Sequence, residues 1–335
     1  FSVSLALMGV IAISGSTHDI AGDGIYLDEL NAETQSKYSG WQGAFYNLAK
    51  VLANGSLVFL AGWLTRAMKL SITESWQIIL GICSVVILCV ALYHWKMLPK
   101  GQPPKKTENF KEKTTELWGV ITSFFQKKYI WLYLAFIFLY RFAEGLAMKI
   151  APLFLKDAIV KGGIGLGNEE YGLIYGTFGT VAFIVGSILA GYFASYFGLK
   201  KVIFVLACAF NIPFVVYLLL AIFQPNQVLY IATGIIFEYF GYGFGFVGLM
   251  LFMMQQIAPG SHKMAHYAFA NSLMNLGVMV PGMISGYLSN LLGYKSFFIL
   301  VMFATIPALL MAWFLPFTHN NKIETAKDAD TTQHN

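Results

Sequence analysis

Ionisable residues inside the long apolar stretches of this chain are concentrated in three of those stretches. They are His18, Asp19 and Asp23 in 1–27, Arg141, Glu144 and Lys149 in 129–155, and Glu238 in 228–254, with Lys50 in 41–64 as the one addition. A charge in hydrocarbon costs about 3 kcal/mol on insertion scales, so such residues face a wet cavity or a partner. Charges that recur on every third stretch favour helices that jointly line a central polar path, a pattern typical of a transporter.

Two carboxylates in the first stretch are spaced for proton chemistry. Asp19 and Asp23 are four residues apart, which places both on one face of a helix. Two carboxylates that close in a medium of low dielectric constant cannot both ionise cheaply, so one of them is expected to hold a proton. Both are therefore candidates for proton coupling, although a structural hydrogen bond to the next loop also accounts for Asp23. His18, about 100° around the helix, is a weaker candidate, because an interhelical hydrogen bond also explains it.

The second stretch carries a polar stripe of Asn47, Lys50 and Asn54 at positions i, i+3 and i+7. Lys50 and Asn54 are candidates for binding a substrate. A lysine near the middle of a span suits a substrate carboxylate, and it also suits neutralisation of Asp19 on a neighbouring helix. The spacing leaves both roles open.

The fourth stretch contains an arginine and a glutamate three residues apart, Arg141 and Glu144, near the expected centre of a span. This spacing permits an ion pair within one helix. The planar guanidinium also matches a carboxylate or a phosphate with two hydrogen bonds, so Arg141 is equally a candidate for anion binding. Lys149 lies nearer the end of the span, where it can bind substrate or extend to the membrane surface.

The seventh and eighth stretches add the last candidates. Glu238 precedes a run in which glycines alternate with aromatic residues, FGYGFG, which favours either helix breaking or close helix packing. An unpaired glutamate in that setting is a proton-coupling candidate, and Tyr242 on the same run is a substrate-binding candidate. Asn271, in a stripe with Tyr267 and Asn275, is a milder candidate, since such stripes also form hydrogen bonds between helices.

The elements that must position these residues are long apolar helices. Hydrophobic residues make up 57% of the 335 positions and charged residues 12%, far from the average of a soluble domain. The expected spans are 1–27, 41–64, 76–98, 129–155, 171–197, 201–223, 228–254, 264–290 and 296–317. This predicts an all-α polytopic membrane protein with nine visible transmembrane helices.

The composition also excludes several classes of site. The three cysteines lie inside apolar stretches without paired spacing, so neither a disulfide nor a metal site is expected. The net charge of +5 calls for no nucleic-acid partner, because the basic residues are concentrated in loops. No serine-hydrolase, zinc-protease or nucleotide-binding motif occurs, so neither a cofactor nor an enzymatic activity is expected.

A basic loop divides the chain. Residues 98–128 are rich in lysine, and their second half spaces apolar residues three and four apart, which predicts an amphipathic helix on the membrane surface. We expect residues 1–97 to end an N-terminal half, 98–128 to link the halves, 129–317 to form a six-helix C-terminal half and 318–335 to be a disordered tail. The excess of lysine on the side of this loop predicts a cytoplasmic C-terminus.

The arrangement of segments around this loop indicates a two-part architecture. Three segments precede the loop and six follow it, and Phe1 begins in the middle of an apolar run. Transporters are often built from two similar halves. We therefore expect three further helices before Phe1, which gives twelve in all.

Two loop motifs resemble those of the major facilitator superfamily. The run GYFASYFGLKK from Gly191 to Lys201 is similar to that superfamily's cytoplasmic loop motif, G-x-x-x-D-[RK]-x-G-[RK]-[RK], with Ser195 in place of the acidic residue and Tyr196 in place of the first basic one. These departures put the gating ion pair of the motif in doubt. The run from Gly282 to Gly286, followed by Gly293, is similar to the end of the eleventh helix. By this numbering the visible segments are helices four to twelve of a helical bundle.

A sharper resemblance lies in the first stretch. The run STHDIAGDG from Ser16 to Gly24 resembles the T-Q-D-I-A-x-D signature shared by muropeptide permeases of the AmpG type and acetyl-CoA transporters, with His18 in place of glutamine. The resemblance implies a monomeric permease of the bacterial inner membrane that carries a small anionic solute, such as a sugar–peptide, in symport with protons. Two alternatives stay open: a carrier of acyl-CoA or another organic anion, and a polytopic acyltransferase that uses His18 and Asp19. Charges distributed over several helices favour transport, since an enzyme would gather its polar groups at one membrane face.

Overall fold

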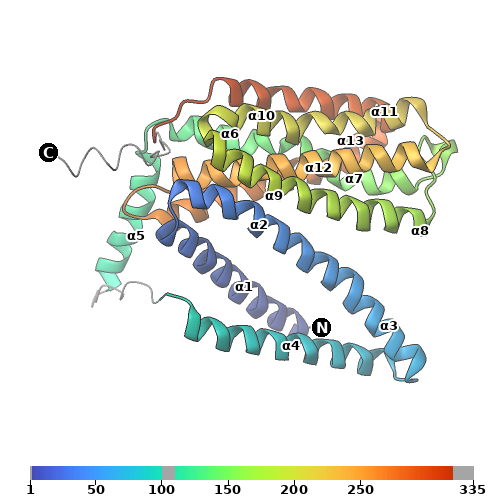
Figure 1. Cartoon of the computed structure of the whole chain (residues 1–335), viewed down its shortest axis with the longest axis horizontal. Helices are drawn as coiled ribbons and strands as arrows, with labels where there is room; N and C mark the ends of the chain where they lie inside the picture. Colours follow the sequence, from blue (N-terminus) through green and yellow to red (C-terminus); the bar gives the residue numbers. More distant parts are fainter. Residues whose placement is uncertain (1, 100–109, 320–335) are drawn as a thin grey trace. The chain divides into compact units, whose positions relative to one another are not determined.

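The computed structural model describes residues 2–99 and 110–319 (Figure 1). Every regular element in these two ranges is helical. The chain divides into two compact units, one made of Phe1–Ala44 with Thr114–Asn335 and the other of Phe45–Lys113. The smaller unit contains the π-helix η1 (Leu52–Leu57), α3 (Val58–Ala67) and α4 (Ile72–Met97). Ala61, Leu64 and Ile79 form its buried core.

The larger unit carries most of the helices. Its regular helices are α1 (Ser2–Glu29), the first part of α2 (Ala32–Val51), α5 (Phe110–Phe125), α6 (Ile130–Tyr140), α7 (Phe142–Lys156), α8 (Asn168–Tyr171), α9 (Gly179–Phe197), α10 (Leu199–Asn211), α11 (Val215–Phe223), α12 (Val228–Phe252) and α13 (Lys263–Trp313). Short π and 3₁₀ turns join them, namely η2 (Ile159–Lys161), η3 (Gly172–Phe178), η4 (Ile212–Phe214) and η5 (Met253–Ile257). Large aromatic side chains fill the cores between these helices.

Seven helices in the described ranges are long and apolar enough to cross a membrane, which confirms a polytopic helical architecture. The expected number of nine is not confirmed. The longest of the seven, Lys263–Trp313, contains a left-handed backbone at Gly293 (φ 71°), where two helices meet in a turn that glycine adopts without a steric penalty. The expected span 41–64 is not among the seven; in the structure this stretch covers the end of α2, η1 and the first part of α3.

Glycines in α12 allow its neighbours to approach closely. A Cβ atom on Gly243 would overlap the carbonyl of Phe183 on α9, and one on Gly245 would overlap Phe210 on α10. The helix nevertheless runs unbroken from Val228 to Phe252. The glycine and aromatic run therefore serves close packing, and the alternative of a broken helix does not hold.

The C-terminal end of α5 and the residues after it pack against one end of the larger unit and form hydrogen bonds with it. Phe124 is buried and meets the ring of Phe269 edge to face at 5.3 Å. The Lys127 ammonium donates to the carbonyls of Ile257 at 2.6 Å and Pro259 at 2.5 Å, where it caps the end of η5. Burial lowers the pKa of Lys127 below 10.5. Membrane-surface contact by α5 stays a prediction.

The last described residues form hydrogen bonds near the same end of the larger unit. Gln256 accepts hydrogen bonds from the backbone N–H groups of Thr318 and His319, at 3.0 and 3.2 Å, and donates to the His319 carbonyl. Burial, followed by the charge of Lys127, lowers the pKa of His319. The sequence predicts disorder for residues 318–335. From residue 320 onward, these positions lie outside the described residues.

Candidate functional site

The helix pair α6–α7 is broken at Arg141, inside the candidate span Ile130–Lys156. Arg141 has φ −102° and ψ 4°, and its backbone N–H donates to the carbonyl of Leu139, two residues earlier, instead of four. Discontinuous spans of this kind are used by transporters to build binding sites, because the interruption frees backbone groups and directs side chains inward.

Arg141 and Glu144 form a bidentate ion pair just after this break. The Arg141 Nε lies 2.6 Å from Glu144 Oε2, and a terminal guanidinium nitrogen donates to Oε1 at 2.7 Å. Both side chains are buried, with 8% and 2% of their surface exposed. The guanidinium carbon also lies 5.3 Å from the centre of the Phe246 ring, a cation–π contact. Two parallel, charge-assisted hydrogen bonds offset the cost of burying both charges.

A second carboxylate lies beside the pair. The Tyr242 hydroxyl donates to Glu144 Oε1 at 3.0 Å. Glu238 lies one turn earlier than Tyr242 on α12, and only 1% of its surface is exposed. The Tyr217 hydroxyl donates to Glu238 Oε2 at 3.1 Å, while Oε1 has no hydrogen-bond partner among the described residues. Glu144 and Glu238 are close enough for their charges to interact. The cluster thus combines two carboxylates with one guanidinium.

Two polar residues that the sequence analysis did not identify support the break. Asn211 is fully buried, and its Nδ2 donates to the carbonyl of Tyr140, the last residue of α6, at 3.4 Å and to Ala207 at 3.2 Å. The Tyr140 hydroxyl donates to the carbonyl of Gly245 on α12 at 2.7 Å. Asn211 was detectable as an isolated amide in an otherwise apolar stretch. Nothing in its spacing indicated which carbonyl it would reach.

The predicted residues of the first helix are not part of this cluster. His18 and Asp19 are exposed on α1. Asp23 is partly buried and accepts a hydrogen bond from the Gln42 side chain at 2.8 Å, and its charge interacts with that of Asp19. The hydrogen-bond partner of Asp23 is thus on α2, whereas the structural alternative for Asp23 named the loop that follows the first helix.

The remaining candidates are dispersed. In the smaller unit the Lys50 ammonium lies 4.3 Å from the centre of the Tyr46 ring, and the side chain of Asn54 lies outside the described residues. Lys149 is exposed on α7, and its stem lies next to Gly282. Asn271 is partly buried on α13. The structure brings together Arg141, Glu144, Glu238 and Tyr242.

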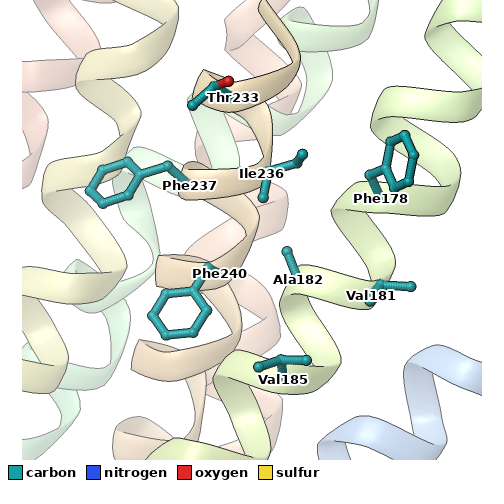
Figure 2. A pocket seen from close by; sticks show the side chains of 8 residues that line it. All are labelled: Phe178, Val181, Ala182, Val185, Thr233, Ile236, Phe237 and Phe240. Atoms are coloured by element: carbon teal, nitrogen blue, oxygen red, sulfur yellow. The ribbon is translucent and has the colours of Figure 1, made fainter. Parts of the chain in front are cut away.

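An apolar groove of about 490 Å³ lies between α9 and α12 (Figure 2). Figure 2 shows side chains of both helices along it, and the residues that line it are Phe178, Val181, Ala182, Val185, Thr233, Ile236, Phe237 and Phe240. The lining carries a single hydroxyl and no charge, so the groove does not suit an anion. Within the described ranges no group of His, Cys, Asp and Glu side chains could hold a metal ion.

Comparison with known proteins identifies the family. The model of the Major Facilitator Superfamily matches residues 137–333, more than half of the chain. The chain belongs to the major facilitator superfamily. The matched range includes the break at Arg141, the ion pair and Glu238. The family and the apolar helices are those of a multi-pass protein of the bacterial inner membrane.

Individual relatives confirm the resemblance to the AmpG branch. The anhydromuropeptide permease of Escherichia coli K12 is 24% identical over 312 residues, which cover 91% of this chain and 58% of that protein. "Putative transporter AmpG 2" of Rickettsia felis is 26% identical over 269 residues, 77% of this chain and 60% of that protein. "Putative transporter AmpG 4" of Rickettsia conorii is 21% identical over 311 residues, 91% and 70% of the two chains. The chain spans about three fifths of the first two.

Proposed function

We propose that this protein is a secondary active transporter that moves an anionic sugar–peptide of the muropeptide class across the inner membrane in symport with protons. The family and the names of the relatives support transport over catalysis. The observation that carries the proposal is the buried, bidentate Arg141–Glu144 pair at a break in a membrane span, with the Glu238 carboxylate next to it.

The pair offers a direct route from cargo binding to proton binding. A carboxylate of the cargo presents the same two oxygens as Glu144, so it can replace Glu144 in the Arg141 fork. Glu144 would then face Glu238 with only the Tyr242 hydroxyl to stabilise its charge. Two unpaired carboxylates in a dry site cannot both remain ionised, so one of them takes up a proton. Cargo and proton therefore bind together.

Alternating access would move the two halves, residues 1–97 and 129–317, around this site while the basic linker stays cytoplasmic. Asp19, Asp23 and His18 are candidate proton-coupling residues in the N-terminal half. The excess of lysine around the linker supports a cytoplasmic C-terminus. We propose a monomer as the working unit, because each six-helix half completes one side of a single path.

A carrier of acyl-CoA or another phosphorylated anion is the second candidate. The observation that favours it is the same guanidinium fork, since phosphate also accepts two parallel hydrogen bonds from arginine. Uptake distinguishes the two. In vesicles that contain the full chain, labelled muropeptide should enter and unlabelled acyl-CoA should not compete. The reverse result would favour the second candidate.

Proton coupling is tested in the same vesicles. An inward acid gradient should drive muropeptide accumulation, and a protonophore should abolish it. Asp19→Asn should remove gradient-driven accumulation while exchange of labelled for unlabelled cargo continues, because the amide fixes Asp19 in a form that cannot release a proton. Accumulation that is indifferent to the gradient would exclude symport, and an unchanged pH dependence in Asp19→Asn would make Asp19 a structural residue.

A further inference from the structure

Four tyrosines form a continuous row that leads to the Arg141–Glu144 pair. We call Tyr171, Tyr175, Tyr239 and Tyr242 the tyrosine row. Tyr171 stacks on Tyr175 with ring centres 5.0 Å apart, and Tyr175 meets Tyr239 edge to face, also at 5.0 Å. Tyr239 meets Tyr242 edge to face at 6.4 Å, and the Tyr242 hydroxyl donates to Glu144.

The row runs from one end of the larger unit towards its interior. Tyr171 ends α8 and Tyr175 lies in η3, whereas Tyr239 and Tyr242 belong to α12. Figure 1 shows α8 at the opposite end of this unit from α5. The Lys156 ammonium lies 5.6 Å from the centre of the Tyr171 ring at the outer end of the row. One end thus carries a cation and the other meets the buried ion pair.

All four tyrosines are partly exposed. Helix α12 also borders a surface that is almost wholly apolar. The groove between α9 and α12 is lined by phenylalanine and branched aliphatic side chains (Figure 2). Aromatic residues that served packing or lipid contact alone would gain nothing from hydroxyl groups, whereas the Tyr242 hydroxyl already has a polar partner in Glu144.

A saccharide matches this surface. One face of a pyranose ring is made of C–H groups and packs on an aromatic ring, while its hydroxyl and acetamido groups exchange hydrogen bonds with phenolic oxygens, which act as both donors and acceptors. Tyrosine supplies both features with few rotatable bonds, so little conformational entropy is lost when the ligand binds. Binding sites of this kind combine aromatic walls with a few polar groups.

We propose that the tyrosine row binds the saccharide part of the cargo, while Arg141 binds an anionic group of the same molecule. This inference rests on the proposed function and assigns to it a site for the sugar. The row then fixes the orientation of the cargo, with its sugar along η3 and α12 and its negative charge at the end of the row. A cargo without the sugar would retain the ion-pair contact alone.

Calorimetric titration of the full chain in detergent tests the assignment. The probes are intact muropeptide, the disaccharide N-acetylglucosaminyl-N-acetylmuramic acid, and the free stem peptide. Tyr175→Leu and Tyr239→Leu should each weaken disaccharide binding at least tenfold and leave binding of the peptide unchanged. Tyr175→Phe and Tyr239→Phe retain the ring and should weaken it only two- to threefold. Tyr230→Leu is the matched control, a tyrosine of α12 outside the row with 62% of its surface exposed, and should bind like the wild type.

Each outcome decides the question. Disaccharide binding that is unchanged in both leucine variants, or lost together with peptide binding, would overturn the proposal. If the leucine variants do not fold, saturation-transfer NMR on the wild type replaces them. Irradiation of aromatic protons should then saturate the ring C–H protons of the disaccharide, and saturation confined to its acetyl methyl groups would refute the assignment. A wild type that binds and transports no muropeptide would instead refute the proposed function.

Discussion

Separate and joint removal of Arg141 and Glu144 should have opposite consequences for stability. Arg141→Met leaves the Glu144 carboxylate buried with only the Tyr242 hydroxyl, and Glu144→Gln leaves the guanidinium without an anionic partner, beside the face of Phe246. Removing one member of a buried pair strands the other and costs about 3–5 kcal/mol. Each single variant loses the bidentate, charge-assisted pair, so we expect values inside that range.

The two single variants need not be equal. Phe246 at 5.3 Å still attracts the guanidinium, and a cation–π contact in a desolvated site contributes about 2 kcal/mol. Glu144 retains one charge-assisted hydrogen bond, worth about 1.5–3 kcal/mol. These compensations are similar in size, so the two losses should agree to within about 1 kcal/mol. The double variant Arg141→Met/Glu144→Gln removes both charges of the pair, and it should regain most of the lost stability.

The assay is equilibrium unfolding of the full chain in mixed detergent micelles, combined with binding of muropeptide to the same samples. Lys149→Met is the control, because this lysine is an exposed charge on the same helix and its loss should change stability little. Arg141→Lys should weaken cargo binding although the charge remains, because an ammonium cannot form two parallel hydrogen bonds. A double variant with full stability and normal cargo affinity would refute the role of Arg141 in anion binding. Single variants as stable as the wild type would refute the buried pair itself.

Three further outcomes follow from the described contacts. Asn211→Leu leaves the Tyr140 carbonyl without its donor and should raise the KM for cargo five- to tenfold, the value of one buried hydrogen bond. Asn211→Asp, when protonated, should recover part of this loss at low pH, and a KM that does not change in exchange assays would argue against the supporting role. Gly243→Ala should lower the unfolding temperature, because its methyl group meets the Phe183 backbone, whereas Gly286→Ala, with no atom nearby, should not. Because the pKa of His319 is lowered in the folded chain, its contribution to stability is present above its ordinary value of 6.5 and is lost as the pH falls below that value. The protection factor for hydrogen exchange at the Thr318 amide, taken relative to the intrinsic rate at each pH, should therefore fall in acid, and His319→Asn should remove this dependence.

The helices were predictable because run length and apolar composition alone determine whether a segment can span a bilayer. The cost of charge in hydrocarbon likewise distinguishes Arg141, Glu144 and Glu238 from the apolar residues around them. The interruption at η1 was not predictable, because polar residues and glycines in the stretch 41–64 are compatible with either a regular or a widened helix. The loop motif placed Gly198 at a turn, where the backbone has φ +82°.

The sequence did not predict which side chains contact the charged residues. The rotation and depth of α11 relative to α12 decide which side chain contacts Glu238. Neither can be derived from the helical periodicity of a single segment. Tyr217 is therefore visible only in the structure, as is the row formed by Tyr175 and Tyr239. The α5 helix shows the same limit. Its apolar stripe was evident, but only the structure shows that Phe124 is buried while 66% of the surface of Trp118 stays exposed.

The spacing of Arg141 and Glu144 within one span also bears on how the chain enters the membrane during synthesis. A translocon releases helices into lipid one or a few at a time, and an arginine at the centre of a helix adds about 3 kcal/mol to the apparent free energy of insertion. A partner three residues away in the same helix is present from the start, so this segment can leave the translocon as a neutral pair before α12 has been made. A partner on a later helix would not yet have been synthesised when this segment enters the lipid.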